Sequence, residues 1–223
     1  SMHKDLFDDP VTQDLLDRIS GASILLGPYE EGRYKQPNPV QIVAELCHAV
    51  NSQHQSMHFA ITLGANRAPI DSVRAIQNAS SGQTGWYIAE YLFRFGHKVT
   101  VVAGKTSAAP SFELPVVIRA GSPDEMLSEC LTVAKSNPDG WVHAAAVLDY
   151  YTQPLDGKKL SGENEWVLEL QPGPKHIKEL SEHIGNARRI GFKLETGVSI
   201  DQLHKRALNQ IAMYGVDATI ANL

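Results

Sequence analysis

The sequence is poor in cysteine and in long apolar runs, and it carries no surplus of basic residues. Cys47 and Cys130 show neither the C-x-x-C spacing of a zinc site nor the density of a disulfide framework. We therefore expect reduced thiols in the core of a cytoplasmic protein. No stretch approaches the roughly 20 apolar residues of a membrane span, and no secretory apolar segment is visible near the N-terminus.

The charge balance argues against a nucleic-acid partner. Lysine and arginine number 20 against 25 aspartates and glutamates, which gives a formal net charge of −5. No G-x-G-x-x-G follows the first strong strand pattern, and no Tyr-x-x-x-Lys motif is present, so an NAD(P)-dependent oxidoreductase is the weaker alternative. A chain of 223 residues is long enough for one domain with a real core and an additional segment.

What the sequence does contain is an alternation of buried-strand and helix patterns. Apolar runs predict strands, and capping signals predict helices that begin after Asn38, Ser122 and Ser199. A half-exposed strand is expected over residues 166–170, where apolar and polar residues alternate. We expect an α/β fold with a doubly wound, mainly parallel sheet. The buried strands are expected at residues 57–63, 99–103, 116–119 and 141–147.

The most informative stretch runs from residue 61 to residue 85, between the first of these strands and a helix. It holds Gly64, Arg67, Pro69-Ile70-Asp71, Val73-Arg74, Asn78 and Ser80-Ser81-Gly82. Connections in α/β domains are usually short, so a polar loop of this length indicates function. Ser-Ser-Gly at a helix start offers N–H groups and hydroxyls to an anion. Taken alone, those three residues are as well explained by an ordinary helix cap.

Together these residues resemble the signature of phosphopantothenate–cysteine ligase, the amide-forming enzyme of coenzyme A synthesis. The turn departs from the pattern, because bacterial members usually have Gly-Gly-Thr where this chain has Gly64-Ala65-Asn66. Further blocks follow in the family's order: Ala145-Ala146-Val147-Leu148-Asp149-Tyr150, Lys159-Leu160-Ser161, residues 189–196 and residues 216–223. His143, within the apolar run that precedes Ala145, is expected to be a packed core residue.

The resemblance implies a Rossmann-like domain with a flexible flap and a β dimer arm. It implies a homodimer that joins 4′-phosphopantothenate to L-cysteine through an acyl-nucleotide, with CTP or ATP as co-substrate and Mg²⁺ as cofactor. Lys159 is expected to bind the triphosphate, with Lys158 as the neighbour that could replace it, and Asn78 to act on the acyl intermediate. The residues expected to bind the anionic groups of the substrate are Arg74, Ser80, Ser81 and Gly82. Those expected to line the nucleotide site are Gly64, Ala145, Asp149 and Phe192.

The first 56 residues are expected to form a separate segment. The stretch from Gly27 to Leu46 resembles the tail of the flavin-dependent decarboxylase that precedes the ligase in bifunctional bacterial proteins. Because the flavin-binding parts are not in this sequence, no FMN is expected. The ligase domain is expected at residues 57–223, and the family continues for a further strand and helix.

The sequence leaves an alternative open for the choice of nucleotide and another for the activity. Phe192-Lys193-Leu194-Glu195-Thr196 is similar to the ATP-using members, whereas the block from Ala145 to Tyr150 and the decarboxylase-like tail are similar to CTP-using bacterial ones. On that comparison CTP is narrowly favoured. The altered turn and the missing C-terminal elements keep open a non-catalytic nucleotide-binding or regulatory relative.

Overall fold

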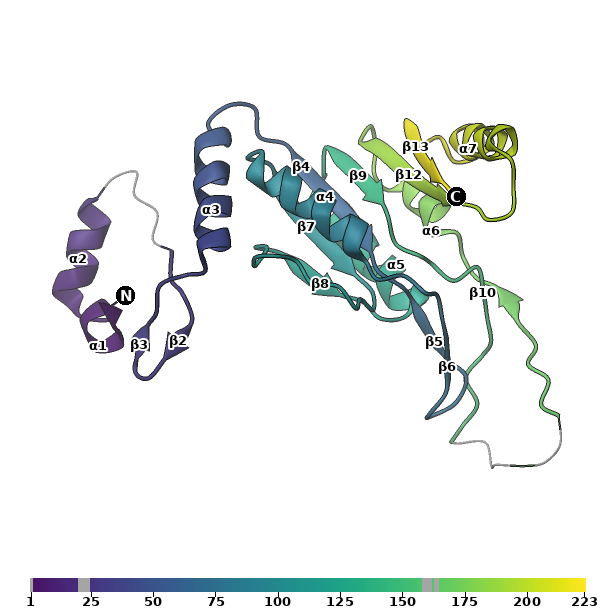
Figure 1. Ribbon diagram of the computed structural model, residues 1–223, viewed down its shortest axis with the longest axis horizontal. Coiled ribbons are helices and arrows are strands. Elements are labelled where there is room, and N and C mark those ends of the chain that lie inside the picture. The colour runs from purple at the N-terminus through teal and green to yellow at the C-terminus, as the bar shows by residue number, and fades with distance from the viewer. Residues whose placement is uncertain (1, 20–24, 158–161, 163–164) are drawn as a thin grey trace.

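The computed structural model describes residues 2–19, 25–157, 162 and 165–223, and its centre is a six-stranded sheet (Figure 1). Every strand pair in this sheet is parallel, and the order across it is β13–β12–β9–β4–β7–β8. The expected α/β Rossmann-like class is confirmed. The strands are β4 His58–Leu63, β7 Lys98–Ala103, β8 Val117–Arg119, β9 Gly140–His143, β12 Arg188–Leu194 and β13 Ala218–Asn222.

The sheet changes direction between β4 and β9. The chain builds β4, β7 and β8 outward to one edge, then returns to the other side of β4 and builds β9, β12 and β13 outward to the opposite edge. The connections that follow β4 and β9 therefore diverge, and a crevice opens beyond the carboxyl ends of these two strands. In open α/β sheets ligands bind at this switch point.

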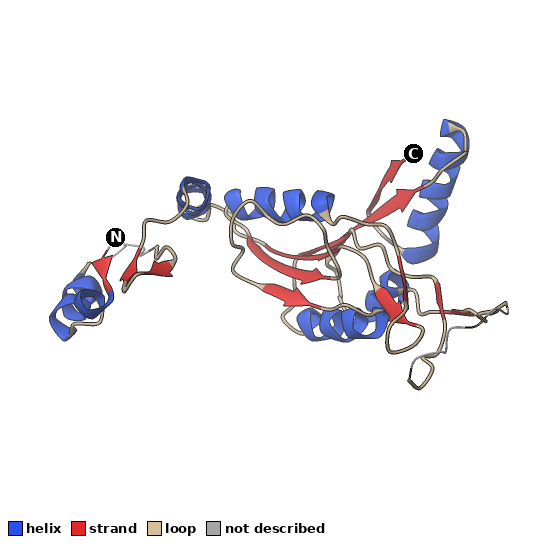
Figure 2. Cartoon of the chain, turned by 60° about the horizontal axis from the view of Figure 1, so that its bottom comes forward, coloured by secondary structure: helices blue, strands red, loops and turns tan. Residues whose placement is uncertain are grey.

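Helices cover both faces of the sheet (Figure 2). Helices α3, Pro39–Asn51, and α4, Gln83–Arg94, build one core with the Ile61 and Leu63 side chains of β4. On the other face, α5, Pro123–Ala134, packs with Ala60. Helix α6, His176–Glu179, and the 3₁₀ turn Leu180–Glu182 join α5, while α7, Ile200–Tyr214, packs against β13.

The helix starts follow the capping signals of the sequence. Ser122 and Ser199 each accept a hydrogen bond from a backbone N–H three residues on, and the side chains of Glu125 and Gln202 return the bond in two capping boxes. Asn38 caps α3, with a proline in the first turn. The three predicted helix starts are therefore confirmed. They could be predicted because a cap depends only on residues within one helical turn.

The N-terminal elements lie at one end of the molecule, beyond α3 (Figure 1). The helical spacing of Ile42, Val43, Leu46, Cys47 and Val50 predicts one buried apolar face for α3. The structure differs: Val43, Leu46 and Val50 are more than half exposed, and Ala44 packs into the core instead. Cys130 is a buried core thiol as expected, but Cys47 is only partly buried. The elements are β1 Met2–His3, α1 Lys4–Phe7, α2 Pro10–Arg18, β2 Tyr29–Glu30 and β3 Arg33–Tyr34.

Two hairpins extend from the sheet. β5, Arg67–Pro69, pairs with β6, Ala75–Gln77, inside the long signature loop. β10, Tyr150–Tyr151, pairs with β11, Gln171–Pro172. Residues 166–170, predicted as a half-exposed strand of a hairpin or dimer arm, pair with no other strand in the described part of this single chain. Within the described residues, none of the helices combines the length and hydrophobicity that a bilayer crossing requires.

Candidate functional site

A pocket of about 790 Å³ lies at the switch point, beyond the carboxyl ends of β4 and β9. It brings together residues that the sequence places far apart, from the signature loop, the end of β9, the start of α6 and strand β12. Most of the predicted site residues contribute to its lining: Asn78, Ser80, Ser81, Gly82, Ala145, Asp149 and Phe192.

The Ser-Ser-Gly sequence forms the start of α4. Gly82 is the N-cap residue in a left-handed conformation, with φ +79°, and a Cβ there would stand 2.6 Å from the Thr106 side chain. Ser80 Oγ accepts from the Gly82 N–H at 3.3 Å, and Ser81 Oγ accepts from the Gln83 N–H at 3.3 Å. Each hydroxyl keeps a hydrogen that it can donate, so this helix start presents donors suited to an anion.

Asn78 joins the signature loop to the segment that follows β9. Its Nδ2 donates to the carbonyl oxygen of Ala146 at 3.0 Å and to that of Val147 at 3.1 Å. An amide nitrogen has two hydrogens, so both are engaged with the backbone. Donation to a reaction intermediate therefore requires one of these bonds to open. In the arrangement observed, Asn78 fixes the distance between two walls of the pocket.

The Gly64-Ala65-Asn66 turn is tightly built. Gly64 has φ +80°, and a Cβ there would lie 2.8 Å from the Lys105 carbonyl oxygen, which explains the glycine. Ala65 and Asn66 are fully buried, and Ala65 bridges to both Lys105 and Ala146. Gly64 thus supports the pocket from behind and is not part of its lining.

Arg74 lies outside the pocket lining, on the β5–β6 hairpin. Its guanidinium pairs with the fully buried Asp71 side chain and stands 5.5 Å from the ring centroid of Trp166. Asp71 also accepts from the backbone N–H groups of Val73 at 2.8 Å and Arg74 at 2.7 Å. The structure therefore does not bring Arg74 to the Ser-Ser-Gly site; it places this side chain between the hairpin and the segment that follows the flap.

The flap lysines Lys158 and Lys159 lie outside the described residues. The segment that leads into them is held against the hairpin loop: the Leu155 N–H donates to the Ile70 carbonyl at 2.8 Å, and the Ser72 N–H donates to the Gly157 carbonyl at 3.1 Å. The chain is therefore anchored up to Gly157 on the hairpin that carries Arg74.

An ion pair that the sequence did not suggest lies in the pocket. Lys175 Nζ contacts Asp149 Oδ1, and both side chains line the cavity. The Gly173 N–H donates to the Asp149 carbonyl at 2.9 Å, and the β10–β11 pairing joins the two segments. In the sequence, Lys175 ends the run Gln171-Pro172-Gly173-Pro174-Lys175, which resembles the family's Asn-Pro-Asp segment only weakly.

Strand β12 supplies the aromatic wall. Phe192 is partly buried and lines the pocket with its neighbour Lys193 and with Asn222 of β13. Lys193 Nζ lies 3.0 Å from Glu195 Oε1, and the hydrogen bond from Lys193, with the charges of Lys193 and Arg206 and a second bond from Arg206, outweighs burial and lowers the pKa of Glu195. Sequence reasoning selected Phe192 but missed Lys193 and Asn222, whose positions depend on the pairing of β12 with β13.

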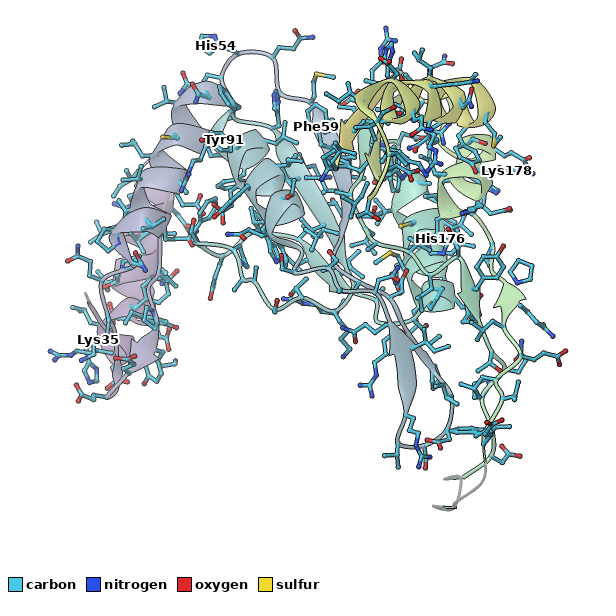
Figure 3. The ribbon with its side chains drawn as sticks, turned by 45° about the vertical axis from the view of Figure 1, so that its right-hand side comes forward. Lys35, His54, Phe59, Tyr91, His176 and Lys178 are labelled. Carbon is cyan, nitrogen blue, oxygen red and sulfur yellow. The ribbon has the colours of Figure 1, made fainter. Side chains whose placement is uncertain are left out.

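Two buried imidazoles form the floor of the site on the α5 side. Burial lowers the pKa of His143 to about 3, with Arg189 and His176 contributing, and burial lowers that of His176 to about 4 despite the opposing charge of Asp124. Figure 3 shows His176 turned toward the body of the domain and Lys178 at its outer surface. Both imidazoles are therefore neutral at physiological pH, and the expectation of a packed His143 is confirmed.

The described residues contain no cluster of three or more histidine, cysteine, aspartate or glutamate side chains that could enclose a metal ion. Asp149 is the carboxylate that lines the pocket. Magnesium commonly keeps several waters and is held by one or two carboxylates together with substrate phosphates. The donor set therefore fits a Mg²⁺ ion that arrives with a nucleotide, not one held in a protein cage.

Comparison with known proteins shows which family the chain resembles. Residues 54–223 match the family model described as "DNA/pantothenate metabolism flavoprotein C-terminal domain". The Coenzyme A biosynthesis bifunctional protein CoaBC of Thermococcus kodakarensis is 32% identical over 226 residues, which cover 100% of this chain and 56% of that protein. The CoaBC protein of Methanocaldococcus jannaschii is 29% identical over 228 residues, which cover 100% of this chain and 55% of its length. The chain thus spans about half the length of these curated relatives.

Solved structures agree with the fold. The C-terminal domain of a CoaBC protein superposes with a TM-score of 0.63 at 28% identity, covering 77% of this chain and 79% of that one. A DNA/pantothenate metabolism flavoprotein from Streptococcus pneumoniae gives a TM-score of 0.68 at 26% identity, covering 75% and 82%. The Cab2 H337A mutant, in complex with phosphopantothenate-cysteine, has a TM-score of 0.64 at 19% identity, covers 82% and 78%, and supports the fold alone.

Proposed function

Because the chain belongs to the family of DNA/pantothenate metabolism flavoprotein C-terminal domains, we propose that it is a cytoplasmic ligase joining 4′-phosphopantothenate to L-cysteine. The observation that carries the proposal is the pocket itself. It combines an anion-binding helix start at Ser80-Ser81-Gly82 with the end of β9 from Ala145 to Asp149. These are two of the blocks in which the sequence resembles phosphopantothenate–cysteine ligases.

The proposed reaction has two steps. The carboxylate of 4′-phosphopantothenate attacks the α-phosphate of a nucleoside triphosphate, so that an acyl-nucleotide forms and pyrophosphate leaves. The amine of cysteine then attacks the acyl carbon, loses a proton, and displaces the nucleoside monophosphate. Negative charge builds on the phosphates in the first step and on the acyl oxygen in the second, and the site must stabilise both.

We assign stabilisation of the phosphate charge in the first step to Lys159 and to the start of helix α4. The hydroxyls at this helix start can donate hydrogen bonds to phosphate oxygens. Mg²⁺, when it is bound beside Asp149, supplies further neutralisation of the phosphates. Phe192 and the alanines after β9 form the wall against which a base packs. Asn78 stands between these parts, and its hydrogen bonds to Ala146 and Val147 hold the acyl and nucleotide sides at a set spacing.

We further propose CTP as the co-substrate and a homodimer as the active form. CTP is favoured because the block from Ala145 to Tyr150 and the decarboxylase-like tail are similar to those of CTP-using bifunctional bacterial members. Turnover with CTP and ATP measured side by side decides the nucleotide, and a clear ATP preference contradicts CTP. Sedimentation velocity measures the oligomeric state, and a monomer at assay concentration contradicts the dimer.

The activity is tested by pyrophosphate release with each substrate omitted in turn. A ligase releases pyrophosphate only when nucleotide and 4′-phosphopantothenate are both present, and forms phosphopantothenoylcysteine when cysteine is added. Nucleotide binding without pyrophosphate release identifies a non-catalytic relative. Oxidation of NADPH or NADH by the chain would identify an oxidoreductase.

A further inference from the structure

The pairing of Lys175 with Asp149 raises a question that the proposed function leaves open. Both side chains line the pocket, and both remain about half exposed, with 45% of the lysine and 57% of the aspartate side chain accessible. An ion pair this exposed contributes little to folding. Its position in the pocket therefore calls for an explanation other than stability.

Local structure does not explain the lysine. Lys175 is the N-cap residue of α6, yet its side chain makes no capping hydrogen bond. Serine, threonine, aspartate and asparagine are the residues that cap helix starts, because their oxygens accept from the first N–H groups. A lysine has only donors and cannot act in this way.

The ligand of the pocket explains it better. A nucleoside triphosphate is highly anionic, and the carboxylate of Asp149 on the same wall would repel it. Lys175 cancels that charge, and its flexible stem lets the ammonium turn from the carboxylate to a phosphate oxygen. Lys193, the other lysine in the lining, is already paired with Glu195, which is also bound by Arg206.

Resting on the ligase function proposed above, we infer that Lys175 is a phosphate-binding residue of the nucleotide site, held by Asp149 until the triphosphate enters. Lys175 exchanges its carboxylate partner for phosphate, and the freed Asp149 turns to the remaining polar or cationic groups of the nucleotide complex. The anionic end of the nucleotide then has a cation supplied by α6, in addition to the lysine expected from the flap.

The test measures equilibrium binding of CTP, ATP and cytidine by calorimetry, without the other substrates. Lys175→Met should weaken triphosphate binding about tenfold to a hundredfold, the usual effect of losing a charge-assisted hydrogen bond. Cytidine, which lacks phosphates, should bind with unchanged affinity. Lys175→Arg should restore most of the loss. Lys178→Met is the matched control, because Lys178 lies on the same short helix but is exposed and outside the lining.

The Asp149→Asn background separates phosphate binding from simple neutralisation of the carboxylate. If Lys175 contacts phosphate, Lys175→Met still weakens triphosphate binding when residue 149 is uncharged. If the effect disappears in that background, or if the single variant binds like wild type, the inference is overturned while the proposed function stands. A wild-type protein that binds neither CTP nor ATP overturns the proposed function, and the inference with it.

Discussion

Mild acidification should destabilise this protein, because two buried histidines of the site resist protonation in the folded state. Burial lowers the pKa of His143 to about 3 and that of His176 to about 4, against 6.5 for an ordinary imidazole. Within the described residues, Nε2 of His143 and both ring nitrogens of His176 have no hydrogen-bond partner. Arg189 lies near His143 and disfavours its charge further, whereas Asp124 opposes the lowering at His176.

The size and the sign of this change in folding stability follow from proton linkage. Below pH 6.5 the unfolded chain binds protons at these imidazoles and the folded chain does not, so stability falls as pH decreases. Well below pH 6.5 the slope of each histidine approaches about 1.4 kcal/mol per pH unit, and together they remove about 3 kcal/mol between pH 6.5 and pH 5. Stability is fully retained above pH 6.5, and the loss continues down to pH 4 and then 3, where the folded groups titrate. A typical domain has only about 5–15 kcal/mol in total.

The assay is urea unfolding at several pH values between 7.5 and 5, above the range in which most carboxylates titrate. His176→Gln should reduce the slope of stability against pH by about 1.4 kcal/mol per unit, and His143→Asn by a similar amount. His58, whose pKa burial and Lys98 also lower, adds a dependence that both variants retain. Equal slopes in wild type and both variants would refute the reasoning, as would an NMR titration in which the two folded imidazoles protonate near pH 6.5.

Three further substitutions test the packing and the proposed chemistry. Gly85→Ala should destabilise the fold by about 1–3 kcal/mol, because its Cβ would stand 2.4 Å from that of a leucine in β4. Gly162→Ala, whose added Cβ has no atom of the described residues within 4 Å, is the control in urea unfolding. Lys159→Gln should slow pyrophosphate release by about a hundredfold or more with unchanged stability. Normal release by this variant would contradict the role of Lys159 and make Lys158 the residue to test. Asn78→Asp should let the acyl-nucleotide accumulate and persist after cysteine is added, with the second step slowed roughly a hundred- to a thousandfold. A quench experiment in which no acyl-nucleotide forms would assign Asn78 to substrate binding or spacing instead.

Much of the fold could be predicted from short-range patterns. The buried runs before Gly64 and Ala145 became neighbouring strands, and the capping boxes at Ser122 and Ser199 formed as expected. These features are local or repeat along the chain, so residue type and spacing are sufficient to encode them. The alternation of strands and helices also restricts the sheet to few topologies, since parallel crossovers are right-handed and usually join neighbours.

The same patterns failed where the pairing strand or the packing surface comes from a distant part of the chain. Residues 166–170 alternate like a strand, but no neighbouring strand pairs with them in the described part of the chain. Helix α3 has an apolar stripe, yet it buries Ala44 against the rest of the domain and leaves Val43 and Leu46 exposed. Periodicity identifies which residues could be buried together, but the packing partner decides which face is covered.

The sequence by itself determined the family resemblance, the parallel α/β class and part of the pocket lining, because motifs at strand ends and helix starts depend on local geometry. Only the tertiary structure decided that Asp149 meets Lys175, 26 residues further on, that His143 lies near His176, and that Arg74 faces Asp71 and Trp166. These side chains become neighbours through the β10–β11 pairing, the placement of α6 under the sheet and the β5–β6 hairpin. Contacts of this kind depend on the relative positions of separate elements, which no local pattern of residues encodes.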